Sequence, residues 1–397
     1  MGQSLATVAV SLQVYDITRS NLAVGILGVC GLVPLIVLGL YGGALVDAHD
    51  RRRVALGASL ALWLVSIAMA VQAWAGLRSA GLLYVLIALQ SAAFAINNPA
   101  RQAIVPHLVR PQLLPAANAL TTLSWTLGFA LGSFLGGVVV ASVGFGWAYT
   151  VDVVTFLAAL WGVWRLPAMP PEGPVRRPGL ASVVEGLRFL GTRPNVRMTF
   201  LVDLAAMILA QPRALFPAVG AVVLGGGATT AGLLVTATGG GSAVAGLFSG
   251  ALGRVRRQGL AVLVCVALWG LAVAAFGAVV LAAGTGEEGR DGVSWLLWPA
   301  VVLLAVSGAA DAVSAVFRTT ILQAATPDAL RGRLQGVFIV VVAGGPRLGD
   351  VVAGTGGDLF GEGLAALGGG VACAVAVLLL SRRQPRFARY DATDPEP

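Results

Sequence analysis

Long, unbroken runs of hydrophobic residues alternate with short polar stretches along the whole chain. A helix that spans a membrane needs about 20 apolar residues, whereas a strand of a membrane barrel alternates over about ten. The runs in this chain are of the first kind, so the pattern predicts an all-α integral membrane protein. Twelve transmembrane helices are predicted, at residues 3–15, 22–45, 54–76, 80–100, 118–142, 147–165, 197–222, 229–252, 260–284, 295–317, 334–355 and 364–381.

The amino-acid composition agrees with this prediction. The chain is 57% hydrophobic and only 11% charged, and its mean hydropathy is +0.86, which lies outside the range of soluble proteins. The first predicted helix is shorter than a usual span, and no basic residue precedes it. Either the protein begins upstream of Met1, or this helix is incomplete.

The net charge of +8 comes from arginine, because all 26 basic residues are arginine. Most of them fall in alternate predicted loops and in the C-terminal segment, and this set includes the arginines at positions 51–53, 254, 256, 257 and 318. Basic residues are enriched on the cytoplasmic side of membrane proteins. We therefore expect a multi-pass protein of the cell (cytoplasmic) membrane with its C-terminus in the cytoplasm. The basic character then follows from topology and does not indicate nucleic-acid binding.

The chain lacks the residues for several kinds of chemistry. Without lysine it cannot form a phosphate-binding Walker loop or a Schiff base. Its three cysteines and two histidines are scattered singly, without the spacing of metal or redox sites. The sequence therefore predicts no catalytic residue, no metal site and no bound cofactor, which argues against an enzyme.

A proline-rich connection at residues 167–195 divides the chain. It separates an N-terminal six-helix bundle, residues 1–166, from a C-terminal six-helix bundle, residues 196–381, and residues 382–397 are predicted to form a cytoplasmic tail. Within the connection, residues 180–190 show helical spacing of apolar positions. This spacing predicts a short amphipathic helix along the inner surface, or else the segment is a plain tether.

The two halves resemble each other in sequence. Gly43-Ala44-Leu45 and Gly250-Ala251-Leu252 both precede arginines, and Arg101 and Arg318 occupy similar contexts 217 residues apart. Six helices in each half predict pseudo-symmetric parallel repeats, an arrangement of transporters that bind substrate between the halves.

Glycines recur on one face of the predicted fifth and eighth helices. They lie in the stretches 128–136 and 239–250. Small residues at this spacing predict close helix contacts, either as fixed packing or as a seam that moves during transport.

The loop after the second predicted helix contains a motif. It reads Gly43-x-x-x-Asp47-x-x-x-Arg51-Arg52 and resembles the signature loop of the major facilitator superfamily, although Asp50 replaces the usual second glycine. Residues 13–18, 98–101 and 326–333 further resemble the branch that contains enterobactin exporters and macrolide-efflux permeases. The resemblance implies a secondary active transporter that exports a siderophore or an amphiphilic drug-like compound from the cytoplasm. It also implies proton antiport by alternating access, with the proton gradient as the energy source.

The signature loop has a predicted role in conformational gating. Asp47 ends the second helix, and the eleventh helix should begin near Arg333 on the same side of the membrane. A carboxylate near a helix N-terminus gains about 0.3–1 kcal/mol, so this contact would tie the halves together in one conformation. The alternative is that Asp47 pairs with Arg51 in a surface turn. The gating motif as a whole comprises Gly43, Asp47, Arg51, Arg52, Arg101 and Arg333.

Charged residues within the predicted spans are candidate functional groups, because a charge at the bilayer centre costs about 2.5 kcal/mol or more. Asp203 and Asp311 have no evident cation near them in the sequence and are the predicted proton-coupling carboxyls. Arg347 and Asp350 lie three residues apart on one helix, which predicts an internal ion pair. Asp152 lies near the outer end of its helix, where water would solvate it.

Three residues are predicted to contact substrate. Gln90 and Trp125 are candidates for the wall of a cavity, and Arg213 could face an anionic group of the substrate or turn to the membrane surface. Two other functions remain open: a membrane-embedded lipid-modifying or structural protein without transport, and a channel. We expect a monomer whose partners are a small-molecule substrate and the lipid bilayer.

Overall fold

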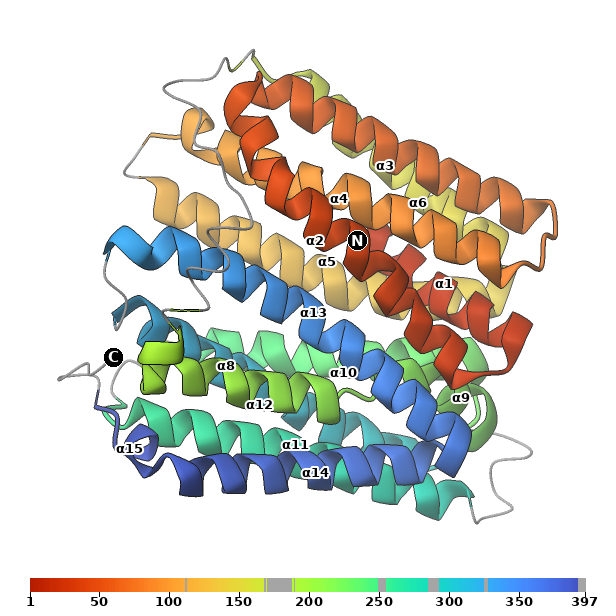
Figure 1. The fold of residues 1–397 in the computed structure, drawn as a ribbon. Helices are drawn as coiled ribbons and strands as arrows, with labels where there is room; N and C mark the ends of the chain where they lie inside the picture. Colours follow the sequence, from red (N-terminus) through yellow and green to blue (C-terminus); the bar gives the residue numbers. More distant parts are fainter. Residues whose placement is uncertain are drawn as a thin grey trace. The chain divides into compact units, whose positions relative to one another are not determined.

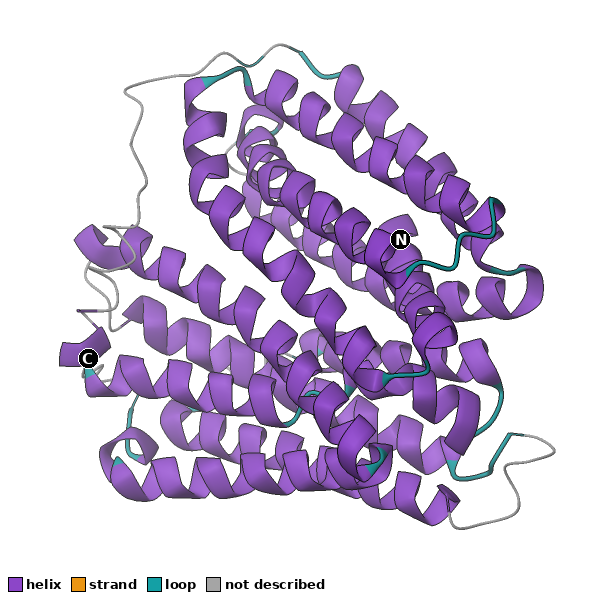
Figure 2. Cartoon of the chain, turned by 45° about the vertical axis from the view of Figure 1, so that its right-hand side comes forward, coloured by secondary structure: helices purple, strands orange, loops and turns teal. Residues whose placement is uncertain are grey.

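The computed structural model describes residues 1–110, 113–167, 169, 188, 190–248, 255–284, 293–324 and 328–391. Inside its helices, only the backbone is described at residues 40–44, 46–48, 105–107, 114–115, 118–119, 323–324, 328–340 and 342–343. Helices make up the regular secondary structure of this part of the chain (Figures 1 and 2). Ten helical segments among the described residues are long and apolar enough to cross a membrane.

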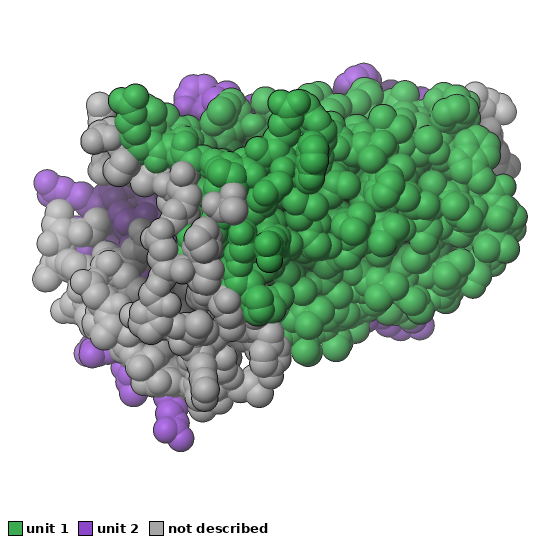
Figure 3. Space-filling view, turned by 90° about the horizontal axis from the view of Figure 1, so that it is seen from above, with its two compact units in different colours: residues 1–18, 26–181 green, residues 19–25, 182–397 purple. Residues whose placement is uncertain are grey.

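The chain forms two compact units, which Figure 3 shows in different colours. Unit 1 consists of residues 1–18 and 26–181, and unit 2 consists of residues 19–25 and 182–397. The division after residue 181 falls within the proline-rich connection, most of which lies outside the described residues. Of the predicted amphipathic helix at residues 180–190, residues 188 and 190 are described, and both are helical. The assignment of residues 19–25 to unit 2 was not predicted.

Unit 1 contains the helices of the first half. They are α1 (Gly2–Thr18), α2 (Asn21–Ala48), whose first five residues belong to unit 2, α3 (Arg51–Trp74), α4 (Ala80–Leu108), α5 (Leu114–Val143) and α6 (Phe145–Trp164). At 1.5 Å per residue, the 17 residues of α1 extend about 25 Å, less than the thickness of a bilayer's hydrocarbon core. Its described part is therefore short, as the sequence predicted.

Unit 2 contains the helices of the second half. They are α8 (Pro194–Leu209), η2 (Arg213–Leu215), α9 (Phe216–Ala218), η3 (Val219–Val223), α10 (Gly227–Leu247), α11 (Gln258–Gly284), α12 (Leu297–Ala324), α13 (Asp328–Phe360), α14 (Glu362–Arg383) and α15 (Pro385–Ala388). Helix α12 extends past its predicted end at residue 317, and α13 begins five residues before Arg333. Arg318, which the sequence placed in a loop, therefore lies inside a helix.

Equivalent turns connect the last two long helices of each unit. Gly144 joins α5 to α6 with a φ of 87°, and Gly361 joins α13 to α14 with a φ of 86°. Residues other than glycine rarely adopt such a φ, because the Cβ atom collides with the backbone. The two glycines are 217 residues apart, the separation that also relates Arg101 to Arg318. These two turns therefore share their spacing with the paired sequence motifs.

Polar side chains inside unit 1 are paired between helices. The amides of Gln13 on α1 and Gln72 on α3 bond to each other at 3.0 and 3.2 Å, and the hydroxyl of Tyr149 on α6 donates to Gln13 at 2.7 Å. Ser66 on α3 donates to Asp152 on α6 at 2.7 Å, and Asp152 is 0% exposed. The expectation that Asp152 is solvated is therefore wrong. Without water in the hydrocarbon region, buried polar groups must find partners in neighbouring helices.

Glycines allow helices to approach closely in both units. Gly132 and Gly136 of α5 face the backbone of α1, and Gly241 of α10 lies against the carbonyl of Ala305 on α12. A Cβ atom at any of these positions would collide with a backbone oxygen. Gly240, one residue before Gly241, has open space where its Cβ would be. Gly132, Gly136 and Gly241 therefore make the close helix contacts that the two glycine stripes predicted, whereas Gly240 does not.

The contrast between adjacent glycines gives a stability prediction. Gly241→Ala should destabilise the protein by about 1–3 kcal/mol, because overpacking forces α10 away from α12. Gly240→Ala is the matched control and should be neutral or stabilising by up to about 1 kcal/mol, because alanine favours the helix more than glycine does. Thermal unfolding of the purified proteins measures both effects. Equal melting temperatures for the two variants would contradict the packing of α10 against α12.

Candidate functional site

The helix at the start of unit 2 is interrupted in the middle of a membrane span. Helix α8 ends at Leu209, and η2 starts at Arg213, directly after Pro212. Proline lacks an N–H group, so it cannot continue the helical hydrogen bonds. The carbonyl of Ala210, in the connection between α8 and η2, accepts a hydrogen bond from Trp269 Nε1 of α11 at 3.1 Å. Interrupted membrane helices occur in transporters near binding sites, and this break presents Arg213 as an exposed residue.

A buried arginine joins two carboxylates beside this break. Arg318 of α12 forms an ion pair through Nη1 with Asp203 of α8, and its Nη2 donates to Asp311 of α12 at 3.2 Å. Asp311 lies seven residues before Arg318, two helical turns away on the same face. The side chains of Arg318 and Asp203 are 7% and 6% exposed, whereas that of Asp311 is 36% exposed. One guanidinium is therefore shared by a buried and an accessible carboxylate.

This arrangement corrects one sequence-based expectation. Asp203 and Asp311 were predicted to have no local cation, yet Arg318 contacts both. The arginine was assigned to a loop because the apolar run was ended at residue 317. The following Thr-Thr-Ile-Leu continues the helix for more than a turn, and that continuation was the available signal.

Further charged residues interact with Asp311 and with one another. Arg213 interacts electrostatically with Asp311 and with Asp350 of α13, and Arg347 of α13 interacts with Asp350. Helix α13 comes close to α8 because Gly349 lies against the carbonyl of Met207. Three arginines and three aspartates thus balance one another in unit 2, and desolvated charges require such pairing. The ion pair of Arg347 with Asp350 stays a prediction.

The elbow between α2 and α3, residues 49–53, is held by hydrogen bonds of Asp50 and Arg52. Asp50 is the N-cap of α3, because its Oδ1 accepts from the backbone N–H groups of Arg52 at 2.9 Å and of Arg53 at 3.3 Å. The guanidinium of Arg52 donates to the carbonyl of Trp164 at the end of α6, at 2.5 Å. An aspartate directly before a helical run is a recognised N-cap signal, although the motif alone did not suggest this role for Asp50.

The remaining residues of the gating motif are only partly described. Gly43 and Asp47 lie in α2, and Arg333 lies in α13, but the side chains of Asp47 and Arg333 are outside the described set. Arg51 is half-buried at the start of α3, and Arg101 is exposed on α4. The contact of Asp47 with the start of α13 therefore stays a prediction.

Two predicted cavity residues lie in unit 1. Gln90 of α4 is buried, and Trp125 of α5 is exposed and contacts the ring of Phe94, with centroids 6.2 Å apart. Whether they contact substrate stays a prediction.

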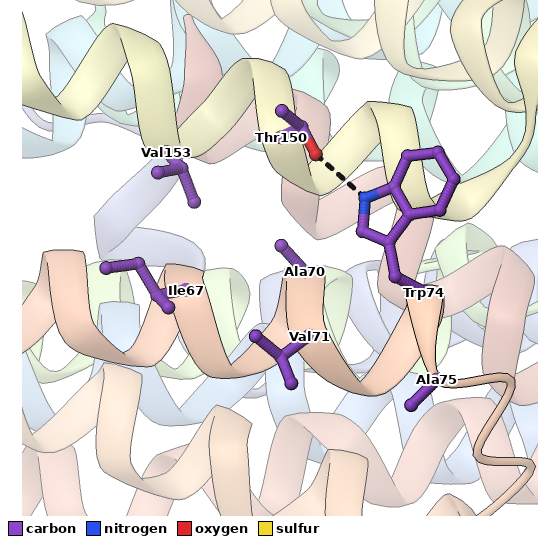
Figure 4. A pocket seen from close by; sticks show the side chains of 7 residues that line it. All are labelled: Ile67, Ala70, Val71, Trp74, Ala75, Thr150 and Val153. Atoms are coloured by element: carbon purple, nitrogen blue, oxygen red, sulfur yellow. Dashed lines mark hydrogen bonds between the residues drawn. The ribbon is translucent and has the colours of Figure 1, made fainter.

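A groove of about 460 Å³ lies elsewhere in unit 1, between α3 and α6 (Figure 4). Its polar groups, the indole N–H of Trp74 and the hydroxyl of Thr150, bond to each other at 3.1 Å. No charged side chain lines the groove as described, so it has no group to orient a polar substrate.

The start of α2 is capped by residues far away in the sequence. Asp358, near the end of α13, accepts hydrogen bonds from the backbone N–H groups of Asn21 at 2.7 Å and Leu22 at 3.2 Å, and from the hydroxyl of Ser20 at 2.5 Å. The amide of Asn21 donates to Glu362 at 2.9 Å. The first N–H groups of a helix have no partner within it, and a carboxylate satisfies them well. Nothing in the local sequence identified Asp358 as the cap.

Removing the shared guanidinium should destabilise unit 2. Arg318→Leu leaves Asp203 buried without its partner, a change that costs about 3–5 kcal/mol. The double variant Arg318→Leu/Asp203→Asn should recover part of this loss, because no buried charge is then left alone. Thermal unfolding measures both variants. The control is Arg78→Leu, which breaks the exposed pair with Asp16 and should lower the stability by less than about 1 kcal/mol. Equal losses of stability in Arg318→Leu and in the control would contradict the buried ion pair of Arg318 with Asp203.

The cap on α2 should be sensitive to acid. Burial raises the pKa of the Asp358 carboxyl, but the hydrogen bonds from Ser20, Asn21 and Leu22 outweigh it, so the net shift is downward. A lowered pKa means that the ionised cap stabilises the folded state above about pH 4 and that this contribution is lost as the pH falls through the folded-state pKa.

Asp358→Ala should therefore lower the melting temperature at neutral pH, and the difference from the unsubstituted protein should shrink in acid. Melting curves between about pH 7 and about pH 3.5 measure this. Asp16→Ala removes an exposed carboxylate and serves as the control. A difference that stays constant across the range would show that Asp358 does not act through its charge.

The whole chain is similar to known transport proteins. A family model described as transmembrane secretion effector matches residues 1–397. The enterobactin exporter EntS of Citrobacter koseri is 29% identical over 394 residues, which cover 99% of this chain and 91% of that protein. The enterobactin exporter EntS of Shigella boydii is 29% identical over 393 residues, which cover 99% of this chain and 90% of the Shigella boydii protein.

Solved structures show the same fold at lower identity. A mutant form of the nucleoside transporter NupG superposes with a TM-score of 0.73 at 12% identity, covering 96% of this chain and 95% of that one. A POT family transporter in complex with 5-aminolevulinic acid gives a TM-score of 0.69 at 12% identity, with 97% and 95% coverage. Together with the apolar helices, these matches make the chain a multi-pass membrane transporter. It belongs to the transmembrane secretion effector family, within the major facilitator superfamily.

Proposed function

We propose that the protein exports a siderophore or an amphiphilic drug-like compound from the cytoplasm, and that inward movement of protons drives this export. The names of the relatives, which are enterobactin exporters, favour the siderophore. In this proposal twelve helices form two pseudo-symmetric six-helix bundles in the cytoplasmic membrane. The C-terminus is cytoplasmic, the protein acts as a monomer by alternating access, and no cofactor is needed.

The observation that supports proton coupling is the sharing of Arg318 by Asp203 and Asp311. The two carboxylates differ in burial, and Asp203 is the buried partner. Asp311 is more accessible, so protons from water reach it more readily. Protonation of Asp311 would leave Arg318 paired with Asp203 alone, and no buried charge would lose its partner. Asp311 is therefore the better coupling carboxyl of the two.

Asp311 can also make the binding of a proton and the binding of substrate mutually exclusive. An ionised carboxylate accepts hydrogen bonds from hydroxyl groups, whereas a protonated carboxyl presents a donor in place of one acceptor. A substrate whose hydroxyls bond to Asp311 would therefore bind the unprotonated form, and a proton would displace it. Mutual exclusion of this kind is what antiport requires. Arg213, Gln90 and Trp125 remain candidates for substrate contact, Arg213 for an anionic group.

The gating motif would control which side of the membrane the site faces. We place Asp47 against the start of α13 near Arg333 when the cytoplasmic side is closed. A contact that forms in one conformation alone biases the equilibrium between the two. Asp50 and Arg52 give the elbow a fixed shape through their bonds to α3 and α6. Asp47 would then be presented by a rigid turn.

Solute flux in proteoliposomes tests this function. A catecholate siderophore or an amphiphilic dye is loaded inside or outside, with and without a pH gradient. We expect saturable flux that the gradient accelerates at least about tenfold. Asp311→Asn should lose this acceleration. Because its amide, like the protonated carboxyl, presents a donor in place of one acceptor, exchange of labelled for unlabelled substrate should also need a higher substrate concentration.

The control variant is Asp16→Asn, which alters an exposed carboxylate and should behave like the unsubstituted protein. Gradient-driven flux that survives Asp311→Asn would remove the coupling role from this residue. Chemical turnover of lipid without solute flux would contradict transport altogether. Retention of a siderophore inside cells that lack the protein, compared with a drug-sensitivity panel, decides between the two substrate classes.

A further inference from the structure

The segment predicted as a tail is docked onto unit 2 as far as residue 391. Phe387 and Tyr390 are buried in a hydrophobic cluster with residues of α8, α11, α12 and α14. The carbonyl of Phe387 lies against Gly259, at the start of α11. Gln384 donates to Asn195, at the start of α8, at 3.4 Å. Figure 1 shows α15 beside the end of α14.

This docking gathers exposed arginines from four elements. We call them the arginine rim, and they are Arg197 on α8, Arg256 and Arg257 before α11, Arg382 and Arg383 at the end of α14, and Arg386 and Arg389 on and after α15. Within residues 193–197, 255–260 and 381–391, Asp391 is the one carboxylate in the sequence. The rim therefore has a large local excess of positive charge.

The rim lies at the boundary between the apolar and polar surfaces of unit 2. On α11, the exposed residues Leu260 and Val264 follow directly after Arg257. On α14, the exposed Leu378 and Leu379 directly precede Arg382. Three residues of helix cover about 4.5 Å, so the guanidinium groups begin where the lipid-facing surface ends. In a bilayer, the polar headgroups lie directly outside the hydrocarbon region.

We propose that the arginine rim is a binding surface for the headgroups of anionic phospholipids. Clusters of four to eight basic residues next to a membrane helix attract negatively charged lipids, and each adds about fivefold to the affinity. Guanidinium groups bind phosphate with two parallel hydrogen bonds. The exposed leucines and valine beside the rim provide an apolar surface for the acyl chains. A soluble phosphate or an acidic protein would make no use of that surface.

Docking distinguishes this surface from a mobile basic tail. Phe387 is 0% exposed and lies between Arg386 and Arg389 in sequence, so its burial fixes where both arginines are presented. If residues 384–391 bound lipid as a loose chain, the burial of Phe387 would not affect lipid binding. In the proposal, lipid binding needs both the buried Phe387 and the arginines.

Titration of the purified full-length protein in neutral detergent tests this proposal. The probes are dioctanoyl phosphatidylglycerol and, for comparison, dioctanoyl phosphatidylcholine, and the readout is the lipid concentration that gives half of the rise in melting temperature. The anionic lipid should stabilise the protein and the zwitterionic lipid should not. Arg386→Gln/Arg389→Gln should raise the required concentration at least about tenfold. Arg53→Gln/Arg110→Gln, which removes two exposed arginines from unit 1, should change it less than about twofold.

Further variants and probes separate a docked lipid site from a loose basic chain and from a site for soluble anions. Phe387→Ala keeps every arginine and should weaken the response as much as the arginine variant does; if it does not fold, the arginine variant alone decides. Equal stabilisation by both lipids, or equal loss in both arginine pairs, would overturn the proposal. Equal stabilisation by inorganic phosphate, or by a polyglutamate peptide, would assign the surface to a soluble anion or to an acidic protein instead. The proton-coupled flux of the arginine variant is measured separately, because the lipid site does not depend on the proposed transport mechanism.

Discussion

The guanidinium of Arg318 is the interaction on which the charged interior of unit 2 depends. A charge in the middle of a membrane protein is stable only when a partner replaces the water it has lost. Arg318 provides this partner for Asp203, which is buried, and also bonds to Asp311, which is more exposed. One guanidinium thus joins two carboxylates on two helices.

The interruption between α8 and η2 is the second element of this interior. Helix α8 ends before Pro212, and the indole N–H of Trp269 on α11 donates to the carbonyl of Ala210 in the connection that follows. The break allows Arg213 to interact with Asp311 and Asp350 from a third direction. Each of these interactions joins different elements, so the charge balance also fixes how the elements of unit 2 pack.

The fold was predictable from the sequence because long apolar runs have few alternatives in a membrane. Hydropathy predicted that the secondary structure is helical and roughly where each helix lies. The turns at Gly144 and Gly361 have the same spacing as the paired sequence motifs. The site was less predictable, because pairing between distant helices leaves no local pattern. Arg318 could have been found by extending its helix through the apolar residues after it, and Asp50 by its place before a helix. Asp358 could not, because the residues it caps are more than 330 positions away.

Helix α2 begins in one unit and continues in the other, and this has a mechanical consequence. Its first residues are held by Asp358 and Glu362 in unit 2, while the rest of the helix belongs to unit 1. Pro34 lies inside the helix, in the part that belongs to unit 1. A helix is stiff along its length but weak at a proline, where one hydrogen bond is missing. Helix α2 is therefore fixed at its first turn by two carboxylates and bends most easily at Pro34, twelve residues beyond Leu22.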